Sequence, residues 1–247
     1  MMKVLKIAKY QALETVKPII VFYSIFVVVI TFLSAGSATS TGIEFSTMIF
    51  LLVVGLNSFK NQFMMTQANN ISRKSFVKGS LLGMLPITLG MSLIDLIINR
   101  VLNVFQRCPT FFDIIYSNYR DLPLTADVNS AWTQANDFKT LLGTVIWQFA
   151  VYSVIYILGF LISLSYYKSN SFMKVFISVI SIVFLSSSYT LNVVIINNFG
   201  INIGQFLASI FGWQSRNPFM AVLSLAVIGS LLSMVIYFFM KKTVIKE

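Results

Sequence analysis

Six long apolar stretches dominate this chain of 247 residues and constrain its fold more than any other feature. A helix needs about 20 residues to cross a hydrocarbon core about 30 Å thick, and each stretch reaches that length or nearly so. They cover Pro18–Leu33, Phe45–Phe59, Leu81–Phe105, Leu141–Ser165, Val175–Ile196 and Phe219–Met240. The sequence therefore predicts an all-α polytopic membrane protein, with six transmembrane helices in one domain over residues 1–247.

Lysine and arginine are distributed unevenly between these stretches. With the N-terminus in the cytoplasm, 13 of the 18 basic residues lie on the cytoplasmic side and 4 outside, while Arg100 lies within a stretch. The positive-inside rule then predicts a multi-pass protein of the cell membrane with both termini cytoplasmic. The net charge of +10 favours anionic membrane lipid as a partner. It does not predict nucleic-acid binding, because no basic stripe interleaved with stacking aromatics lies on a soluble domain.

The composition argues against an enzyme. The chain is 57% hydrophobic and 11% charged, too little charge for the exterior of a soluble protein of this size. It has no histidine and a single cysteine, Cys108, so neither a metal site nor an internal disulfide is expected. No phosphate-binding loop, nucleophile elbow or zinc-protease motif occurs. We therefore predict no catalytic residues, and no cofactor held by this chain itself.

The first 17 residues form a lysine-rich amphipathic segment. Apolar residues such as Val4, Ala8 and Ala12 fall on one helical face and lysines on the other. We expect an interfacial helix over Met1–Lys17, ended by Pro18, which would start the first span at a new angle. The alternative is a charged flanking segment that serves only to orient the chain.

The cytoplasmic segment 60–78 is polar and basic but carries a run of large apolar residues. Phe63, Met64 and Met65 are adjacent, so they cannot all face one way along a helix. We expect a short helix outside the bilayer, with at least one of the three facing a partner protein. A solvated loop with the usual basic residues remains the alternative.

Charged and polar residues inside the spans are candidates for a transport pathway. Asp95 would cost about 2.5–3.5 kcal/mol at a membrane centre, and Arg100 lies about 140° away around the same helix. Their partners must then come from another helix, a second subunit or water, and functional and structural roles both stay open. Ser187 and Asn192 belong to a polar group near the outer end of the fifth stretch, which lines either a wet cavity or a helix contact.

Two outer segments complete the chain. Residues 106–138 are longer than an ordinary connection and hold half of the acids, which predicts an outer cap or loop. Residues 197–218 include the apolar, glycine-punctuated run Phe199–Trp213, which is too short to span a membrane. We expect two re-entrant half-elements there, and a plain outer loop is the alternative.

The whole pattern resembles the permease subunit of ATP-binding-cassette exporters of type 2 topology. Permeases of that family have six spans, cytoplasmic termini, an N-terminal elbow helix (here Met1–Lys17) and a cytoplasmic coupling helix (here within Lys60–Asn70). They also have short outer re-entrant helices between spans five and six, here Phe199–Trp213. The segment Asn69–Phe76, NNISRKSF, followed by Gly79, resembles the lead into the third span of Gram-positive members, such as the phenol-soluble modulin exporters.

The resemblance implies a partnership. Two permeases, identical or paralogous, would each dock a separate ATPase that binds ATP and Mg²⁺, and would export an amphipathic or hydrophobic cargo such as a peptide, toxin or drug-like molecule. The ATPase-coupling residues would be Phe63, Met64, Met65, Gln67, Asn70, Arg73 and Lys74. Two other functions stay open, an ion-coupled secondary transporter and a non-transporting immunity or sensor subunit.

Overall fold

The computed structural model describes an all-helical protein. The described residues are 2–34, 42–105, 108–117, 119, 132–170, 173–175, 202–241 and 243, and no strand occurs among them. The helices are α1 (Met2–Ser34), α2 (Gly42–Asn57), α3 (Lys60–Ala68), α4 (Arg73–Phe105), α5 (Phe111–Tyr116), α7 (Phe138–Lys168), α9 (Ile203–Ile210) and α10 (Pro218–Lys241).

Five helical segments in the described part are long and apolar enough to cross a membrane. They are Lys3–Val29, Ile43–Ala68, Arg73–Phe105, Phe138–Lys168 and Pro218–Lys241. The predicted all-α fold is therefore confirmed for the described residues, and these five helices are compatible with a multi-pass membrane protein. Apart from its first residue, the predicted span Val175–Ile196 lies outside the described residues, and so do Ser187 and Asn192.

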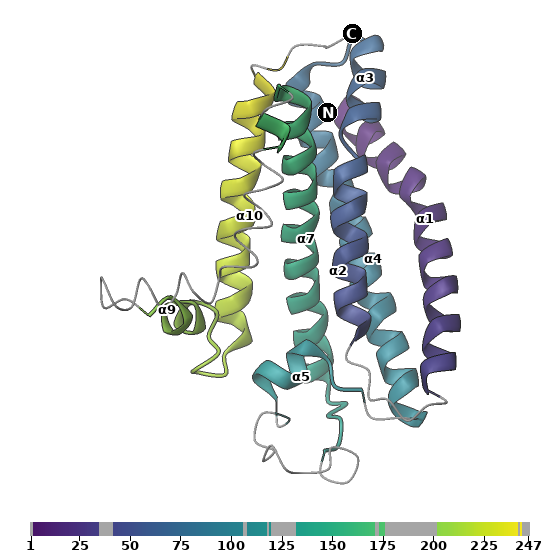
Figure 1. The fold of residues 1–247 in the computed structure, drawn as a ribbon, viewed down its shortest axis with the longest axis vertical. Helices are drawn as coiled ribbons and strands as arrows, with labels where there is room; N and C mark the ends of the chain where they lie inside the picture. The colour runs from purple at the N-terminus through teal and green to yellow at the C-terminus, as the bar shows by residue number, and fades with distance from the viewer. Residues whose placement is uncertain are drawn as a thin grey trace.

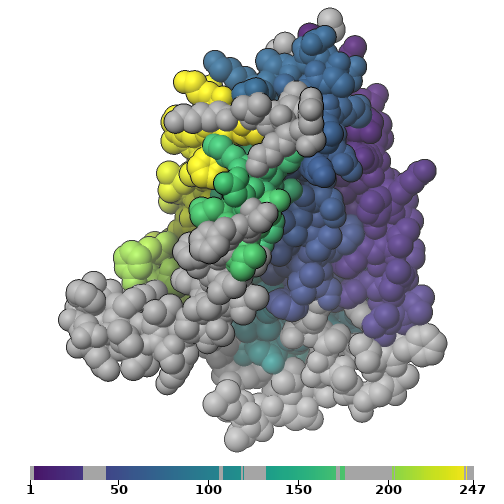
Figure 2. Space-filling model, turned by 45° about the horizontal axis from the view of Figure 1, so that its top comes forward, coloured from purple at the N-terminus to yellow at the C-terminus, as the bar shows by residue number. Residues whose placement is uncertain are grey.

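The long helices form a bundle in which α7 is central. It packs on α2, α4 and α10, while α1 packs on α4 (Figure 1). The start of α1, helix α3 and the end of α10 lie at one end of the bundle, and α5 and α9 lie toward the other (Figure 1). Figure 2 shows α1 in purple on one side of the molecule and α10 in yellow on the other. The start of α1 and the end of α10 thus lie at the same end of the bundle, on opposite sides of it.

Helix α1 corrects one prediction and leaves another unconfirmed. It runs without interruption from Met2 to Ser34, so the predicted helix end at Pro18 is wrong. A separate interfacial elbow helix over Met1–Lys17 is not confirmed, because this segment packs along α4. A Cβ atom on Gly83 of α4 would lie 3.1 Å from the Cα atom of Ala8. This continuous packing offsets the hydrogen bond that a proline removes from a helix interior.

Helices α2 and α7 cross in close contact at two glycines. A Cβ atom on Gly55 would clash with the carbonyl oxygen of Tyr156, and one on Gly159 would clash with that of Leu52. The two backbones therefore touch without intervening side chains. Small residues at helix crossings are a common source of packing energy in membranes, where lipid is as apolar as the helix faces.

Helix α3 follows α2 after a break at Ser58–Phe59 and continues in nearly the same direction, rather than lying across the end of the bundle (Figure 1). A tight turn joins it to α4. Asn70 in this turn has a left-handed φ of 52°, and the Gln67 side-chain amide donates to the carbonyl of Ile71 at 3.0 Å. The tip of the α3–α4 hairpin is thus held by its own hydrogen bonds.

The opposite end carries two short helices. Thr110 and Asp113 form a capping box that starts α5. Helix α9 lies across the direction of α10 (Figure 1), and the Tyr116 hydroxyl donates to the carbonyl of Phe211 at 2.8 Å, which ties α5 to the turn after α9. The described part of segment 197–218 thus contains one short helix and a turn, and the predicted re-entrant pair is not confirmed.

Candidate functional site

Three polar side chains form a ladder along α7 in the centre of the bundle. Gln148, Tyr152 and Tyr156 are spaced four residues apart, so they lie on one helix face about 6 Å from one another. All three are buried. Each is hydrogen-bonded to another helix, as described below, and we call this set the α7 polar ladder.

Tyr152, the middle rung, binds Asp95 of α4, which is fully buried. The Tyr23 hydroxyl of α1 donates to its Oδ1 at 2.6 Å, and the Tyr152 hydroxyl of α7 donates to its Oδ2. The expectation that Asp95 lies buried against other helices is confirmed. Its carboxyl group joins three helices through two tyrosines.

Gln148, the rung nearest α5, holds a second buried acid, Glu44 of α2. Its carboxylate accepts hydrogen bonds from the side-chain amide of Gln148 and from the backbone N–H of Phe111 at the start of α5. Glu44 thus joins α2 to α7 and anchors α5 to the bundle. The predicted span begins one residue later, at Phe45, whereas the structure places Glu44 in the first turn of α2.

Tyr156, the third rung, lies toward the end of the bundle that holds α3. The Tyr156 hydroxyl donates to Ser58 Oγ at 2.6 Å and accepts from the side-chain amide of Gln11 in α1. Beyond it, the Gln62 side chain donates to Glu14 at 3.0 Å. Polar contacts therefore continue from the middle of the bundle to its α3 end.

The two carboxyl groups held by the ladder, Asp95 and Glu44, are titratable. Asp95 and Glu44 are both within spans, and no described lysine or arginine pairs with either. An ionised carboxylate buried without a cation is costly, so a carboxyl group in this position binds a proton or an incoming cation readily. The hydroxyl and amide donors around them hold the two carboxyl groups in fixed positions.

Arg100 is not part of the ladder. Its three guanidinium nitrogens are buried and find no hydrogen-bond partner among the described residues. The acids that act on it electrostatically are Asp113, in the first turn of α5, and Asp137, at the N-cap of α7. Arg100 and Asp95 therefore do not pair, as the 140° separation on their helix predicted.

The seven predicted coupling residues fall into two groups. Phe63 is 0% exposed and packs with Phe59 and Tyr167, at ring-centroid distances of 5.3 and 6.0 Å. The interpretation of Phe63 as a partner-facing residue is corrected, because its ring is inside the chain. Met64 and Met65 are 43% and 44% exposed.

The other coupling residues lie at or after the hairpin tip, where Gln67 and Asn70 shape the turn. Arg73 donates to the carbonyl of Lys241 at 3.3 Å, and Lys74 is exposed. Both basic residues thus face α10 and the solvent beside it rather than the methionine pair.

Sequence reasoning missed Glu44 and the α7 polar ladder. A signal for the ladder was present, because polar residues recur at a four-residue spacing within the apolar run Leu141–Ser165. Glu44 gave no such signal. Its partners, Gln148 and the N–H of Phe111, lie 104 and 67 residues away in the chain.

No protein-family model matches this chain, and no curated protein or solved structure matches it.

Proposed function

We propose that this chain is the permease subunit of an ATP-driven exporter. A separate ATPase, which binds ATP and Mg²⁺, docks at the end of the bundle that holds α3, and this end is cytoplasmic. The proposal includes a sixth span over Val175–Ile196, a location in the cell membrane, and a complex of two permeases with two ATPases.

The observation that carries the proposal is an apolar docking surface at an otherwise polar end. Met65 is exposed and lines a cavity of about 240 Å³ between the start of α1 and the α3–α4 turn. Ile7, Tyr10 and Ile71 contribute to the same cavity. Large apolar anchors that enter such pockets dominate the energy of protein interfaces. We call this feature the methionine notch.

The methionine notch is rigidly connected to the spans. Phe63, one residue before the exposed pair, stacks in a cluster with Phe59, Phe76 and Tyr167. These rings come from the α2–α3 break, α4 and α7. A displacement of α3 by a bound ATPase is therefore passed directly to three helices, because densely packed side chains transmit strain.

We infer the chemical class of the cargo from the exposed faces of the spans. One stripe of α10 is exposed at a spacing of four residues, and it consists of Phe219, Leu223, Val227 and Leu231. Such a stripe faces lipid or a second copy of the permease. A pathway bounded by faces of this kind suits a hydrophobic or amphipathic cargo better than a sugar, which needs many buried polar groups.

The test uses affinity-tagged protein produced in its native host. Wild-type protein should copurify with vanadate-sensitive ATPase activity, and Met65→Asp should reduce this activity at least about tenfold, since burying an unpaired charge at an interface anchor costs more than 1.4 kcal/mol. Met173→Asp is the matched control, because Met173 is also exposed and lies just after α7 ends. It should retain the activity. An equal loss in both variants, or no activity with the wild type, would contradict the proposal.

A second candidate function rests on the α7 polar ladder. A buried carboxyl group with no basic partner among the described residues, as at Asp95, is what an ion-coupled secondary transporter requires near the middle of the membrane. The two functions are separated by energy source in proteoliposomes. Transport that follows a proton gradient without ATP and disappears in Asp95→Asn supports ion coupling. Transport that needs the ATPase and ATP supports the exporter.

A further inference from the structure

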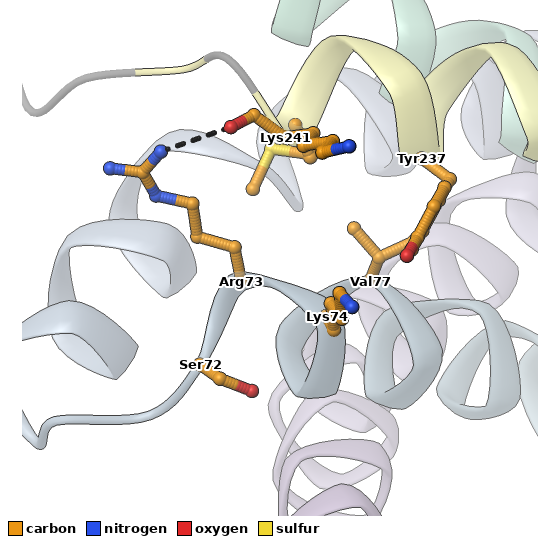
Figure 3. Close-up of a pocket in the computed structure, with 7 residues that line it drawn as sticks. Ser72, Arg73, Lys74, Val77, Tyr237 and Lys241 are labelled. Carbon is orange, nitrogen blue, oxygen red and sulfur yellow. Dashed lines mark hydrogen bonds between the residues drawn. The ribbon is translucent and has the colours of Figure 1, made fainter.

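A basic cavity of about 360 Å³ lies between the start of α4 and the end of α10. Figure 3 shows Arg73 and Lys74 bordering it from α4, with Tyr237 and Lys241 from α10. None of the residues that line it is acidic, and no described carboxylate forms an ion pair with the three cations. Among the described residues, positive charge is therefore concentrated around a hollow without an acidic counterion.

The donors of this basic cavity suit a phosphate group. The Arg73 guanidinium donates one hydrogen bond, to the carbonyl of Lys241 at 3.3 Å, and keeps its remaining donors (Figure 3). Ser72 caps the helix start by accepting from the N–H of Ser75 at 3.2 Å. The N–H groups of Arg73 and Lys74 have no acceptor among the described residues, and the start of a long helix favours an anion. A phosphate offers several oxygen acceptors to such a set of donors.

The position of the basic cavity points to a lipid rather than a soluble molecule. Arg73 begins one candidate membrane-spanning segment and Lys241 ends another, so a bilayer around the bundle would have its headgroups near the cavity. Its walls are partly apolar, through Val77 and Met240. Cations at the ends of membrane-spanning helices meet lipid headgroups, and each contributes about 1 kcal/mol of attraction to anionic lipid.

A second cavity lies further along the contact between α4 and α10, which we call the α4–α10 seam. It measures about 580 Å³, lies between α4, α7 and α10, and includes Met84, Ser230 and Ser233. Met84 is two turns after Val77 on α4, and Ser233 is one turn before Tyr237 on α10, so both cavities lie on the same helix faces. Val77 and Met84 are about 10 Å apart along the helix axis. An acyl chain attached to a headgroup in the first cavity reaches the second.

We propose that the basic cavity binds the phosphate of an anionic phospholipid from the leaflet at this end, with an acyl chain along the α4–α10 seam. The site is independent of the transport proposal. It requires only that the bundle spans a membrane. A free phosphate would satisfy the same cations but would leave the apolar wall and the second cavity unused, so the two sources of phosphate are distinguishable.

The full-length protein is placed in nanodiscs of phosphatidylcholine with an increasing fraction of phosphatidylglycerol, and retained lipid is measured by native mass spectrometry. Phosphatidylglycerol should be retained in preference. Lys74→Gln should lower that preference about fivefold, the factor that corresponds to about 1 kcal/mol for one cation. The triple variant Arg73→Gln, Lys74→Gln, Lys241→Gln should abolish it. Lys74 is exposed and makes no contact that the fold needs, so the single variant tests the site even if the triple variant misfolds.

A matched triple variant controls for net charge. Lys9→Gln, Lys17→Gln and Lys60→Gln remove three exposed cations that do not line the basic cavity, and this variant should keep the preference within about twofold of wild type. An equal loss in the two triple variants would mean that surface charge alone attracts the lipid, and the site would be wrong. Thermal unfolding in pure phosphatidylcholine checks that every variant is folded.

Two further arms separate the sources of phosphate. Excess inorganic phosphate should not displace phosphatidylglycerol, and displacement would identify an anion site without a lipid. Ser230→Trp narrows the second cavity and leaves all three cations in place. It should lower lipid retention severalfold, and unchanged retention would overturn the proposed path of the acyl chain.

Discussion

The crossing of α2 and α7 predicts that one methyl group at Gly159 destabilises the protein. A Cβ atom there would overlap the carbonyl oxygen of Leu52 and would lie 3.1 Å from the backbone nitrogen of Leu56 and 3.2 Å from the Cα atom of Gly55. All three atoms belong to the backbone, so no side chain can rotate away. The helices must separate instead, and they lose the contacts that close packing provides.

The magnitude follows from two opposing effects. Alanine gains about 1 kcal/mol over glycine in a helix interior, whereas overpacking costs about 1–3 kcal/mol. Because the obstruction is backbone on every side, we take the upper value and expect Gly159→Ala to lower the free energy of unfolding by about 2 kcal/mol. For a chain of this size, this corresponds to a melting temperature about 4–8 °C lower.

The control is another glycine in a membrane-spanning helix, Gly90 of α4, around which a Cβ atom would meet nothing within 4 Å. Gly90→Ala should raise the melting temperature by about 2–4 °C through helix propensity alone. Thermal unfolding in detergent, followed by circular dichroism, measures both. Gly55→Ala combined with Gly159→Ala should cost less than the sum of the single variants, because one separation of the helices relieves both clashes. A Gly159→Ala protein as stable as Gly90→Ala would refute the close crossing.

Three other predictions concern orientation, packing and pH. In a background without the native cysteine, Thr133→Cys should react with an impermeant maleimide on intact cells and Asn61→Cys only after permeabilisation, and the reverse pattern would invert the topology. Phe63→Ala should lower the free energy of unfolding by about 3–5 kcal/mol and Met64→Ala by less than about 0.5, since only Phe63 is buried. Similar melting temperatures for these two variants would contradict the packing of α3. Asp137 caps the start of α7. Hydrogen bonds from the Thr140 side chain and, to a lesser extent, from the Thr140 backbone N–H lower the pKa of its carboxyl group. Its stabilisation is therefore present above the unfolded pKa of about 3.9 and is lost as the pH falls through the lower folded value. Hydrogen exchange of the first turn of α7 should accelerate over that range, and the same acceleration in Asp137→Asn would count against the cap.

The spans were the most predictable part of the fold. The predicted stretch Leu141–Ser165 lies within α7, Phe138–Lys168, and Phe219–Met240 lies within α10, Pro218–Lys241. Their ends differ by three residues or fewer because the length of a continuous apolar run is set by the hydrocarbon thickness. The third predicted span begins too late, at Leu81, since the basic first turns of α4 are helical although they are not apolar.

The candidate site was less predictable because it depends on distant contacts. The sequence showed that Phe63, Met64 and Met65 could not all face one way, but it could not show which residue turns inward. Phe63 turns inward onto Phe59, Phe76 and Tyr167, and Tyr167 lies about 100 residues further along the chain. For the same reason Pro18 did not predict the end of a helix correctly, because the packing of α1 on α4 cannot be seen in a local sequence pattern.

The glycine crossing also limits how α2 and α7 can move against each other. Sliding α7 by one turn would carry each rung of the polar ladder about 5.4 Å, close to the next position in the series. The same slide would bring Ile155 or Ser163 to the place of Gly159, and either side chain would strike the backbone of α2. Any rearrangement that keeps these helices in contact is therefore a tilt. The crossing is its pivot, so a small change of angle there displaces the two ends of α7 in opposite directions.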